Sequence, residues 1–208
     1  MIRMNLSLET KAKYACLYAG AVWGLFWIPL RELQDAGFQG LWITVVYFLI
    51  PALCLFPVTI WRWKYVKRGG FQLQLTAIIS GGALFLYSTS IIYTDVVRAI
   101  LLFYLTPVWG IILGRIFLGD KISTPRIIAM IMAIIGMLTI FGLGTKFPLP
   151  QNFGDWLGLS SGFMWAIAMV LINKNNNHST IELTVGFFQW SLILSLFAAV
   201  LLSSHSLP

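Results

Sequence analysis

Long, uninterrupted runs of apolar residues dominate this 208-residue chain. An α-helix needs a run of about 20 such residues to cross about 30 Å of hydrocarbon. The composition points the same way, because 59% of the residues are hydrophobic and 10% are charged, whereas a soluble domain is about 25% charged. The alternating segments of about 10 residues that mark an outer-membrane barrel do not occur. The sequence therefore predicts an all-α polytopic membrane protein.

The apolar runs predict seven transmembrane helices joined by short loops. A short N-terminal segment, 1–12, precedes them, and their expected ranges are 13–31, 37–60, 71–93, 96–118, 125–144, 156–173 and 180–203. None of the loops between them can hold a soluble domain. The longest, residues 145–155, contains Pro148 and Pro150 and is typical of a linker between two halves.

Lysine and arginine are unevenly divided between the two sets of loops. With the N-terminus in the cytoplasm, eleven of them lie inside and three outside, and an excess of basic residues marks cytoplasmic loops. We therefore expect a cytoplasmic N-terminus and, after seven crossings, a C-terminus on the outer side. The inner set is Arg3, Lys11, Lys13, Arg62, Lys64, Lys67, Arg68, Arg115, Lys121, Arg126 and Lys174; the outer set is Arg31, Arg98 and Lys146. This distribution accounts for the net charge of +7 without nucleic acid as a partner.

A shift of the chain against itself by about 142 residues indicates an internal repeat. The shift places Gly20 to Trp23 of the first run on Gly162 to Trp165 of the sixth, and it sets Tyr47 opposite Gln189. Because the first run would cross outward and the sixth inward, this repeat is inverted. Inverted repeats are the architecture of secondary transporters, whose substrate site lies near the bilayer midplane between the halves.

Arg98 lies just inside the outer end of the fourth run, where an arginine needs a partner, a water-filled cavity or an anionic ligand. Asp95, three residues earlier, would share a helix face with Arg98 and is its expected ion-pair partner. Two interpretations remain open. Arg98 either forms an interfacial pair and extends toward water, or it faces an aqueous substrate cavity.

Pro107, in the same run, removes a backbone hydrogen bond and frees the carbonyl of Phe103 in mid-helix. Such a break persists in a membrane where a neighbouring helix or a cavity satisfies the freed group. The sequence is compatible with a helix kink at a packing contact and with one at a cavity.

Aromatic and hydroxyl residues follow some of the predicted spans in two distinct patterns. Trp23, Trp27 and Trp165 lie well inside their spans, where they can stack on a substrate, whereas tryptophans near span ends are typical interfacial anchors. Hydroxyl side chains share one face of the third run, and such stripes are more often helix-packing contacts than ligands. The residues of this stripe are Thr76, Ser80, Tyr87 and Thr94.

One short motif suggests catalysis but lacks the context that catalysis requires. Gly158 to Gly162 matches Gly-x-Ser-x-Gly, the nucleophile elbow, which follows a strand and precedes a helix. Here the motif falls within an apolar run, and the two histidines, His178 and His205, lie in a loop and in the tail. We therefore interpret it as a small-residue packing face. With no metal-ligand spacing, phosphate loop or dinucleotide fingerprint in the sequence, we predict no catalytic residue, no metal and no cofactor.

The stretch from Leu101 to Ala129, continuing to Gly136 and Gly142, resembles the second half of an EamA repeat of the drug/metabolite transporter superfamily. That pattern has a proline in the middle of the fourth span, a Leu-Gly-Glu at its inner end and a glycine-rich fifth span. The stretch from Ala19 to Gly24 is similar to the family's opening helix. Asp120 stands where the family has Glu, and Arg98 stands where many members have a small residue.

The resemblance implies a five-plus-five inverted-repeat fold in the cytoplasmic membrane, with 13–144 as one five-helix repeat and 156–208 as two helices of a second. It implies a permease that moves a small polar metabolite by alternating access. With Arg98 in the cavity, an amino acid or another carboxylate-bearing solute is the expected substrate. Carried onto this chain, the resemblance places these residues along the substrate pathway: Trp23, Trp27, Tyr47, Tyr87, Arg98, Trp109, Trp165 and Gln189.

Two other functional classes remain open at this point. Because the family has ten spans and this chain ends at Pro208 after seven, a truncated product without transport activity is the main alternative to a permease. A membrane-embedded enzyme is a remote one, because the apolar runs hold no catalytic constellation. Membrane lipid and a small-molecule substrate are the expected partners, and the sequence predicts no particular oligomeric state.

Overall fold

The computed structural model describes residues 8–120, 123–143, 150–175 and 178–203, and within these ranges it is helical without strands. Among the described residues, five segments are long and apolar enough to cross a membrane. They are α3 (Trp42–Trp61), α4 (Trp63–Tyr93), the segment Val96–Phe117, α8 (Phe153–Lys174) and Thr180–Leu202 of α9 (Thr180–Ser203). The all-α polytopic membrane fold predicted from the sequence is thus confirmed. Lys146, Lys121 and most of the segment 1–12 lie outside the described residues.

The first predicted span is not one continuous helix. The chain forms α1 (Leu8–Gly24) and a short α2 (Trp27–Asp35), separated by a turn in which the Phe26 N–H donates to the Trp23 carbonyl at 3.1 Å. Pro29 explains the break, because it has no N–H to offer the carbonyl of Leu25 four residues earlier. The expectation of a single helix over 13–31 was therefore wrong, and the turn places Phe26 beside Trp23.

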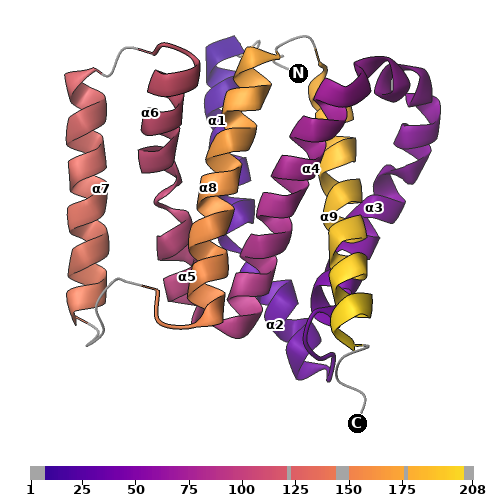
Figure 1. Cartoon of the computed structure of the whole chain (residues 1–208), viewed down its shortest axis with the longest axis horizontal. Helices are drawn as coiled ribbons and strands as arrows, with labels where there is room; N and C mark the ends of the chain where they lie inside the picture. Colours follow the sequence, from indigo (N-terminus) through magenta and orange to yellow (C-terminus); the bar gives the residue numbers. More distant parts are fainter. Residues whose placement is uncertain (1–7, 121–122, 144–149, 176–177, 204–208) are drawn as a thin grey trace, which may run out of the picture.

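The fourth predicted span is kinked where the sequence indicated. It divides into α5 (Val96–Phe103) and α6 (Thr106–Phe117), with Pro107 in the first turn of α6. The fifth forms α7 (Thr124–Leu143), which stands at the edge of the bundle in Figure 1. The lengths of these helices agree with a membrane-spanning role within a multi-pass protein.

Helix α4 occupies the centre of the bundle, with α8 and α9 packed against it (Figure 1). Small residues allow this close approach: a Cβ added to Gly81 would lie 2.9 Å from the Phe187 carbonyl oxygen of α9. Most of the buried hydroxyls of α4 bond to their own helix, as the Ser80 hydroxyl does to the Thr76 carbonyl at 2.8 Å. Thr76 and Ser80 of the predicted stripe are thus buried and bonded within α4, whereas Tyr87 and Thr94 make the contacts with other elements that are described below.

The helices alternate in direction as the predicted topology requires. Figure 1 places the start of α1, the α3–α4 turn and the C-terminal ends of α6 and α8 at one end of the bundle, and the α4–α5 turn at the opposite end. The first of these ends carries most of the basic residues in the predicted cytoplasmic set. Which end faces the cytoplasm stays a prediction.

Candidate functional site

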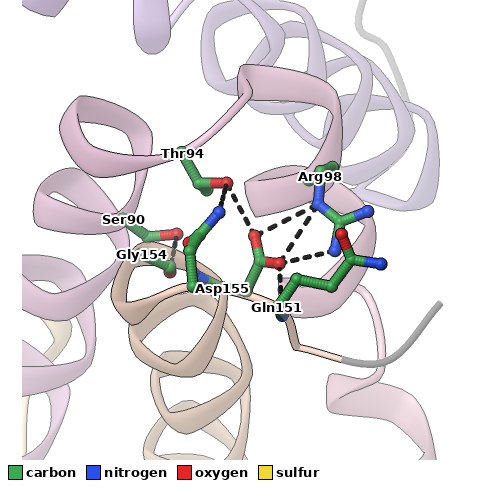
Figure 2. A network of polar contacts seen from close by, with 7 residues as sticks. Ser90, Thr94, Arg98, Gln151, Gly154 and Asp155 are labelled. Carbon is green, nitrogen blue, oxygen red and sulfur yellow. Dashed lines mark hydrogen bonds and ion pairs between the residues drawn. The ribbon is translucent and has the colours of Figure 1, made fainter. Parts of the chain in front are cut away.

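Asp155 is the centre of a polar network at the end of the bundle where α8 begins (Figure 2). Its side chain is fully buried. The carboxylate accepts hydrogen bonds from Arg98 Nε at 3.1 and 3.2 Å, from Arg98 Nη2 at 2.5 Å and from the Thr94 hydroxyl at 2.6 Å. A charge taken out of water needs such compensation. Arg98 and Asp155 thus join α5 to α8.

Hydrogen bonds within the first turn of α8 hold Asp155 in place. Asn152 caps α8, and its side-chain oxygen accepts from the Asp155 N–H at 2.8 Å. The Asp155 carboxylate reaches back to the Gln151 N–H at 2.9 Å. This reciprocal pattern resembles a capping box, and the helix dipole favours an anionic side chain in the first turn. Asp155 is therefore held at a fixed place when Arg98 of α5 meets it.

The ion-pair partner expected for Arg98 was wrong. Asp95 is exposed in the α4–α5 turn, with extended backbone (φ −62°, ψ 134°), and Arg98 pairs with Asp155 instead. The rule that residues three apart share a face holds inside a helix, and Asp95 lies just before one. Asp155 was missed because it was assigned to the linker 145–155, although α8 already begins at Phe153. The spacing of Asn152 and Asp155 is the signal that could have found it.

Further contacts extend the network to α2 and α4. The Asn152 side-chain amide donates to the Thr94 hydroxyl at 3.0 Å, and Arg31 Nη2 of α2 donates to the Thr94 carbonyl at 3.2 Å. The Ser90 hydroxyl donates to the Gly154 carbonyl at 2.7 Å. These contacts connect α4, α5 and α8 at one end of the bundle (Figure 2), and Arg31 adds α2 to them.

Three glycines one turn apart place α8 directly on α4 and α5. An added Cβ would lie 2.7 Å from the Tyr93 carbonyl carbon at Gly154, 2.8 Å from the Ser90 hydroxyl at Gly158 and 2.8 Å from the Phe103 carbonyl oxygen at Gly162. Ser161 is fully buried, and its hydroxyl donates to the Gly158 carbonyl of its own helix. The Gly-x-Ser-x-Gly motif is therefore a packing face, as predicted.

The kink at Pro107 belongs to this same contact. The Phe103 carbonyl that the proline frees accepts a hydrogen bond from the Thr106 hydroxyl and lies against Gly162. Pro107 also borders a cavity of about 200 Å³ between α6 and α8, together with Asp120 and Asn173. The kink therefore lies at a helix-packing contact, with Gly162, and also next to a small cavity.

Aromatic side chains gather on the other side of α4. Trp23 stacks on Tyr87, with ring centroids 5.7 Å apart and planes at 12°, and Tyr87 contacts Phe103 at 4.7 Å. Phe26 contacts both Tyr87, at 5.5 Å, and Tyr47, at 5.0 Å. The cluster draws its rings from both sides of the α1–α2 turn and from α3, α4 and α5.

Two adjoining cavities lie beside this cluster, and Tyr47 and Phe188 line both. One, of about 500 Å³, is bordered by Trp23, Phe26 and Phe187. The other, of about 620 Å³, is bordered by Glu32, the one residue with a carboxylate among the described residues that line these two cavities. Volumes of this size and a largely apolar lining with few polar groups are typical of small-molecule sites.

The residues predicted for the substrate pathway divide into two groups. Trp23 and Tyr47 line the cavities, and Tyr87 and Trp165 pack in the same cluster. The remaining four lie elsewhere: Arg98 in the polar network, Trp27 exposed, Trp109 against Phe163 of α8, and Gln189 bonded to the Thr59 hydroxyl at 2.8 Å. Phe26, Phe187 and Phe188 were missed, because isolated phenylalanines in an apolar run carry no signal of their own.

A second buried ion pair lies at the opposite end of the bundle. Glu182, in the first turn of α9, is 5% exposed and pairs with Arg62, which follows α3, at 2.5 Å. Each of the helices α8 and α9 thus begins with a buried carboxylate held by an arginine from an earlier part of the chain.

Comparison with known proteins agrees with this architecture. The model of the EamA-like transporter family matches residues 11–142. Protein RarD of Escherichia coli (strain K12) is 24% identical over 136 residues, 59% of this chain and 43% of RarD. Protein RarD of Salmonella typhi is 31% identical over 83 residues, 37% of this chain and 28% of that relative. No solved structure shows significant similarity.

The matched region of this chain corresponds to less than half the length of these curated relatives. The family match runs from α1 to the end of α7, so it includes Trp23, Tyr47, Tyr87 and Arg98. It also includes the resemblance noted in the sequence and covers more than half of the chain. The protein belongs to the EamA-like transporter family.

Proposed function

We propose that the chain acts as a permease of the cytoplasmic membrane, which moves a small metabolite by alternating access and performs no covalent chemistry. Family membership supports a transporter rather than an enzyme. The observation that carries the proposal is the pair of cavities lined by Trp23, Tyr47 and Phe188. Their walls come from the family-matched region and from α9, as expected for a site between two repeats.

The cavity lining suggests a substrate with an apolar or aromatic body and an amino group. The aromatic faces suit stacking on such a body. The Tyr47 hydroxyl forms no hydrogen bond to any described residue, so it is available to a ligand. Glu32 offers a carboxylate to a cationic group. Arg98 is neutralised by Asp155 and lines neither of the two cavities, so the expectation that it binds a substrate carboxylate loses its support. Amino acids with apolar side chains supply such a body and an amino group, although none of the described lining residues is a basic partner for their carboxylate.

Counterflow in proteoliposomes tests this function without knowledge of direction or coupling. Vesicles that contain the protein are loaded with unlabelled phenylalanine, leucine, tryptophan or methionine, and uptake of the same amino acid in radiolabelled form is followed. We expect tracer accumulation above that of protein-free vesicles for at least one of them. Accumulation no greater than in protein-free vesicles for all four would contradict this substrate class.

A pair of tryptophan variants tests whether the cavity is the site. Trp23→Ala removes a stacked ring from the cavity wall, and we expect about a tenfold lower counterflow rate, since each aromatic contact contributes about 0.5–1.5 kcal/mol. Trp156→Ala changes a residue that is 57% exposed and lines neither cavity, and it should leave the rate unaltered. Equal rates for the two variants would remove the cavity from the pathway.

The orientation is proposed from the positive-inside rule and has its own test. Alkaline phosphatase folds only in an oxidising compartment, so a fusion after Pro208 should be active if this end lies outside. A fusion in the α3–α4 turn should be inactive, because this turn carries basic residues expected in the cytoplasm. The reverse pattern of activities would invert the topology.

A further inference from the structure

The α3–α4 turn combines exposed aromatic rings with basic side chains. Its residues 61–69, here called the basic turn, read Trp-Arg-Trp-Lys-Tyr-Val-Lys-Arg-Gly. Trp61 is 78% exposed, Trp63 59% and Tyr65 55%. Tryptophan and tyrosine concentrate at the level of lipid headgroups, where an apolar ring and a polar edge both find partners. The basic turn therefore has the composition of a segment at the membrane surface.

Gly70 determines how the basic turn lies. Its backbone (φ 56°, ψ −150°) is a conformation open almost only to glycine, and it interrupts the helix within α4. A Cβ at Gly70 would meet open space, so the backbone conformation and not crowding requires glycine there. Residues 63–69 consequently lie across the end of the bundle instead of continuing the direction of α4 (Figure 1).

Arg62 fixes the basic turn to the rest of the protein. Its Nε donates to the buried Glu182 carboxylate at 2.6 Å, and its guanidinium lies 4.5 Å from the centre of the Tyr65 ring. The carboxylate neutralises this arginine, so Arg62 acts as an anchor rather than as a free charge. The cation–π contact holds Tyr65 in place beside it.

Lys64, Lys67 and Arg68 remain as charges without a carboxylate partner within the described part of the chain. All three are exposed. Their spacing of three and four residues puts them on one side of the short helix. A membrane-surface helix with basic residues on its polar side and aromatic residues nearby binds anionic lipid.

We propose that the basic turn is a binding site for the phosphate headgroup of an anionic phospholipid, in the leaflet at the end of the bundle that holds the α3–α4 turn. Lys64, Lys67 and Arg68 supply the positive charge, and the rings of Trp61 and Trp63 lie at headgroup level. The bound lipid links α4 to the leaflet next to the Arg62–Glu182 anchor. This site is separate from the aromatic cavities and does not depend on the identity of the transported substrate.

Native mass spectrometry of the detergent-solubilised full chain tests the proposal. The protein is titrated with phosphatidylglycerol and, separately, with phosphatidylcholine, and the apparent dissociation constant of the first bound lipid is measured. We expect the triple variant Lys64→Gln, Lys67→Gln, Arg68→Gln to weaken phosphatidylglycerol binding about a hundredfold, since each basic residue at an anionic surface contributes about a factor of five. Binding of phosphatidylcholine should not change.

A charge-matched control separates a site from general attraction. The triple variant Lys11→Gln, Arg115→Gln, Lys174→Gln removes the same charge from other exposed residues of the predicted cytoplasmic set. It should leave phosphatidylglycerol binding within about threefold of the wild type. The charge-conserving variant Lys64→Arg, Lys67→Arg, Arg68→Lys should bind as the wild type does. Equal losses in both neutralised triple variants, or no loss in the first, would overturn the proposal.

Discussion

The two sides of α4 are built on opposite principles. Toward α8, glycines bring backbone against backbone, and Asp155 closes the contact with a dense set of hydrogen bonds. Toward α1, α2 and α3, large rings such as Trp23 and Tyr47 contact one another at a few edges and faces, beside cavities of about 500 and 620 Å³. Small residues pack without voids, whereas bulky rings do so only when their shapes match closely. A larger side chain should therefore lower the free energy of unfolding on the side of α4 that faces α8, and should have little effect on the side that borders the cavities.

Loss of the Asp155 carboxylate should have the largest effect on the tight side. Asp155→Ala leaves Arg98 partly buried without its counter-charge, and breaking such a pair costs about 3–5 kcal/mol. The measurement is the free energy of unfolding in mixed micelles, titrated with a denaturing detergent. Asp95→Ala is the matched control and should cost less than about 0.5 kcal/mol, because Asp95 is exposed and outside the pair. Equal losses for the two variants would refute the Arg98–Asp155 assignment.

Replacing both partners sharpens the same test. The double variant Arg98→Met, Asp155→Leu removes the charges together and should recover most of the stability lost in Asp155→Ala, since apolar residues can replace a buried pair at little cost. A double variant no more stable than Asp155→Ala would show that the carboxylate acts mainly through Thr94 and Gln151 and not through the arginine.

A glycine substitution on each side should have a smaller effect and compares the two sides directly. Gly162→Leu places a side chain against the Phe103 carbonyl oxygen, and we expect a loss of about 1–3 kcal/mol from overpacking. Gly24 is the exposed last residue of α1, next in sequence to the cavity residue Trp23, and an added Cβ there meets nothing within 4 Å, so Gly24→Leu should not destabilise the protein. The readout is the thermal midpoint by size-exclusion chromatography after heating. A lower midpoint for Gly24→Leu than for Gly162→Leu would overturn the contrast.

Much of the helical architecture could be predicted from the sequence, and the exceptions are local. Five of the predicted spans coincide with helices long enough to cross a membrane, because length and apolarity of a run are properties of the chain itself. The break between α1 and α2 was missed, although Pro29 gives a signal for it. The kink before Pro107 was predicted correctly, since loss of the N–H acts within one turn.

The candidate site was less accessible to sequence reasoning. Trp23 and Tyr47, which were predicted to line the substrate pathway, lie at one aromatic cluster and border the two cavities, and their contact with a substrate stays a prediction. Trp109 and Gln189 were assigned to the same pathway but lie in separate contacts with α8 and α3. Which way a side chain points around a helix depends on how the helices rotate and pack against one another, and this is not a local property.

The sequence by itself determined that this protein is a bundle of apolar helices, related to EamA transporters, with its basic residues concentrated at one end. These features follow from the free energy of transferring side chains between water and lipid. Each residue contributes to that free energy independently of the others. Only the tertiary structure decided that Arg98 binds Asp155, 57 residues away. It also decided that glycines of α8 pack closely against α4 and α5, whereas aromatic rings elsewhere border cavities. The partner of a buried charge and the shape of a void depend on which surfaces meet, and that is set by packing of the whole chain.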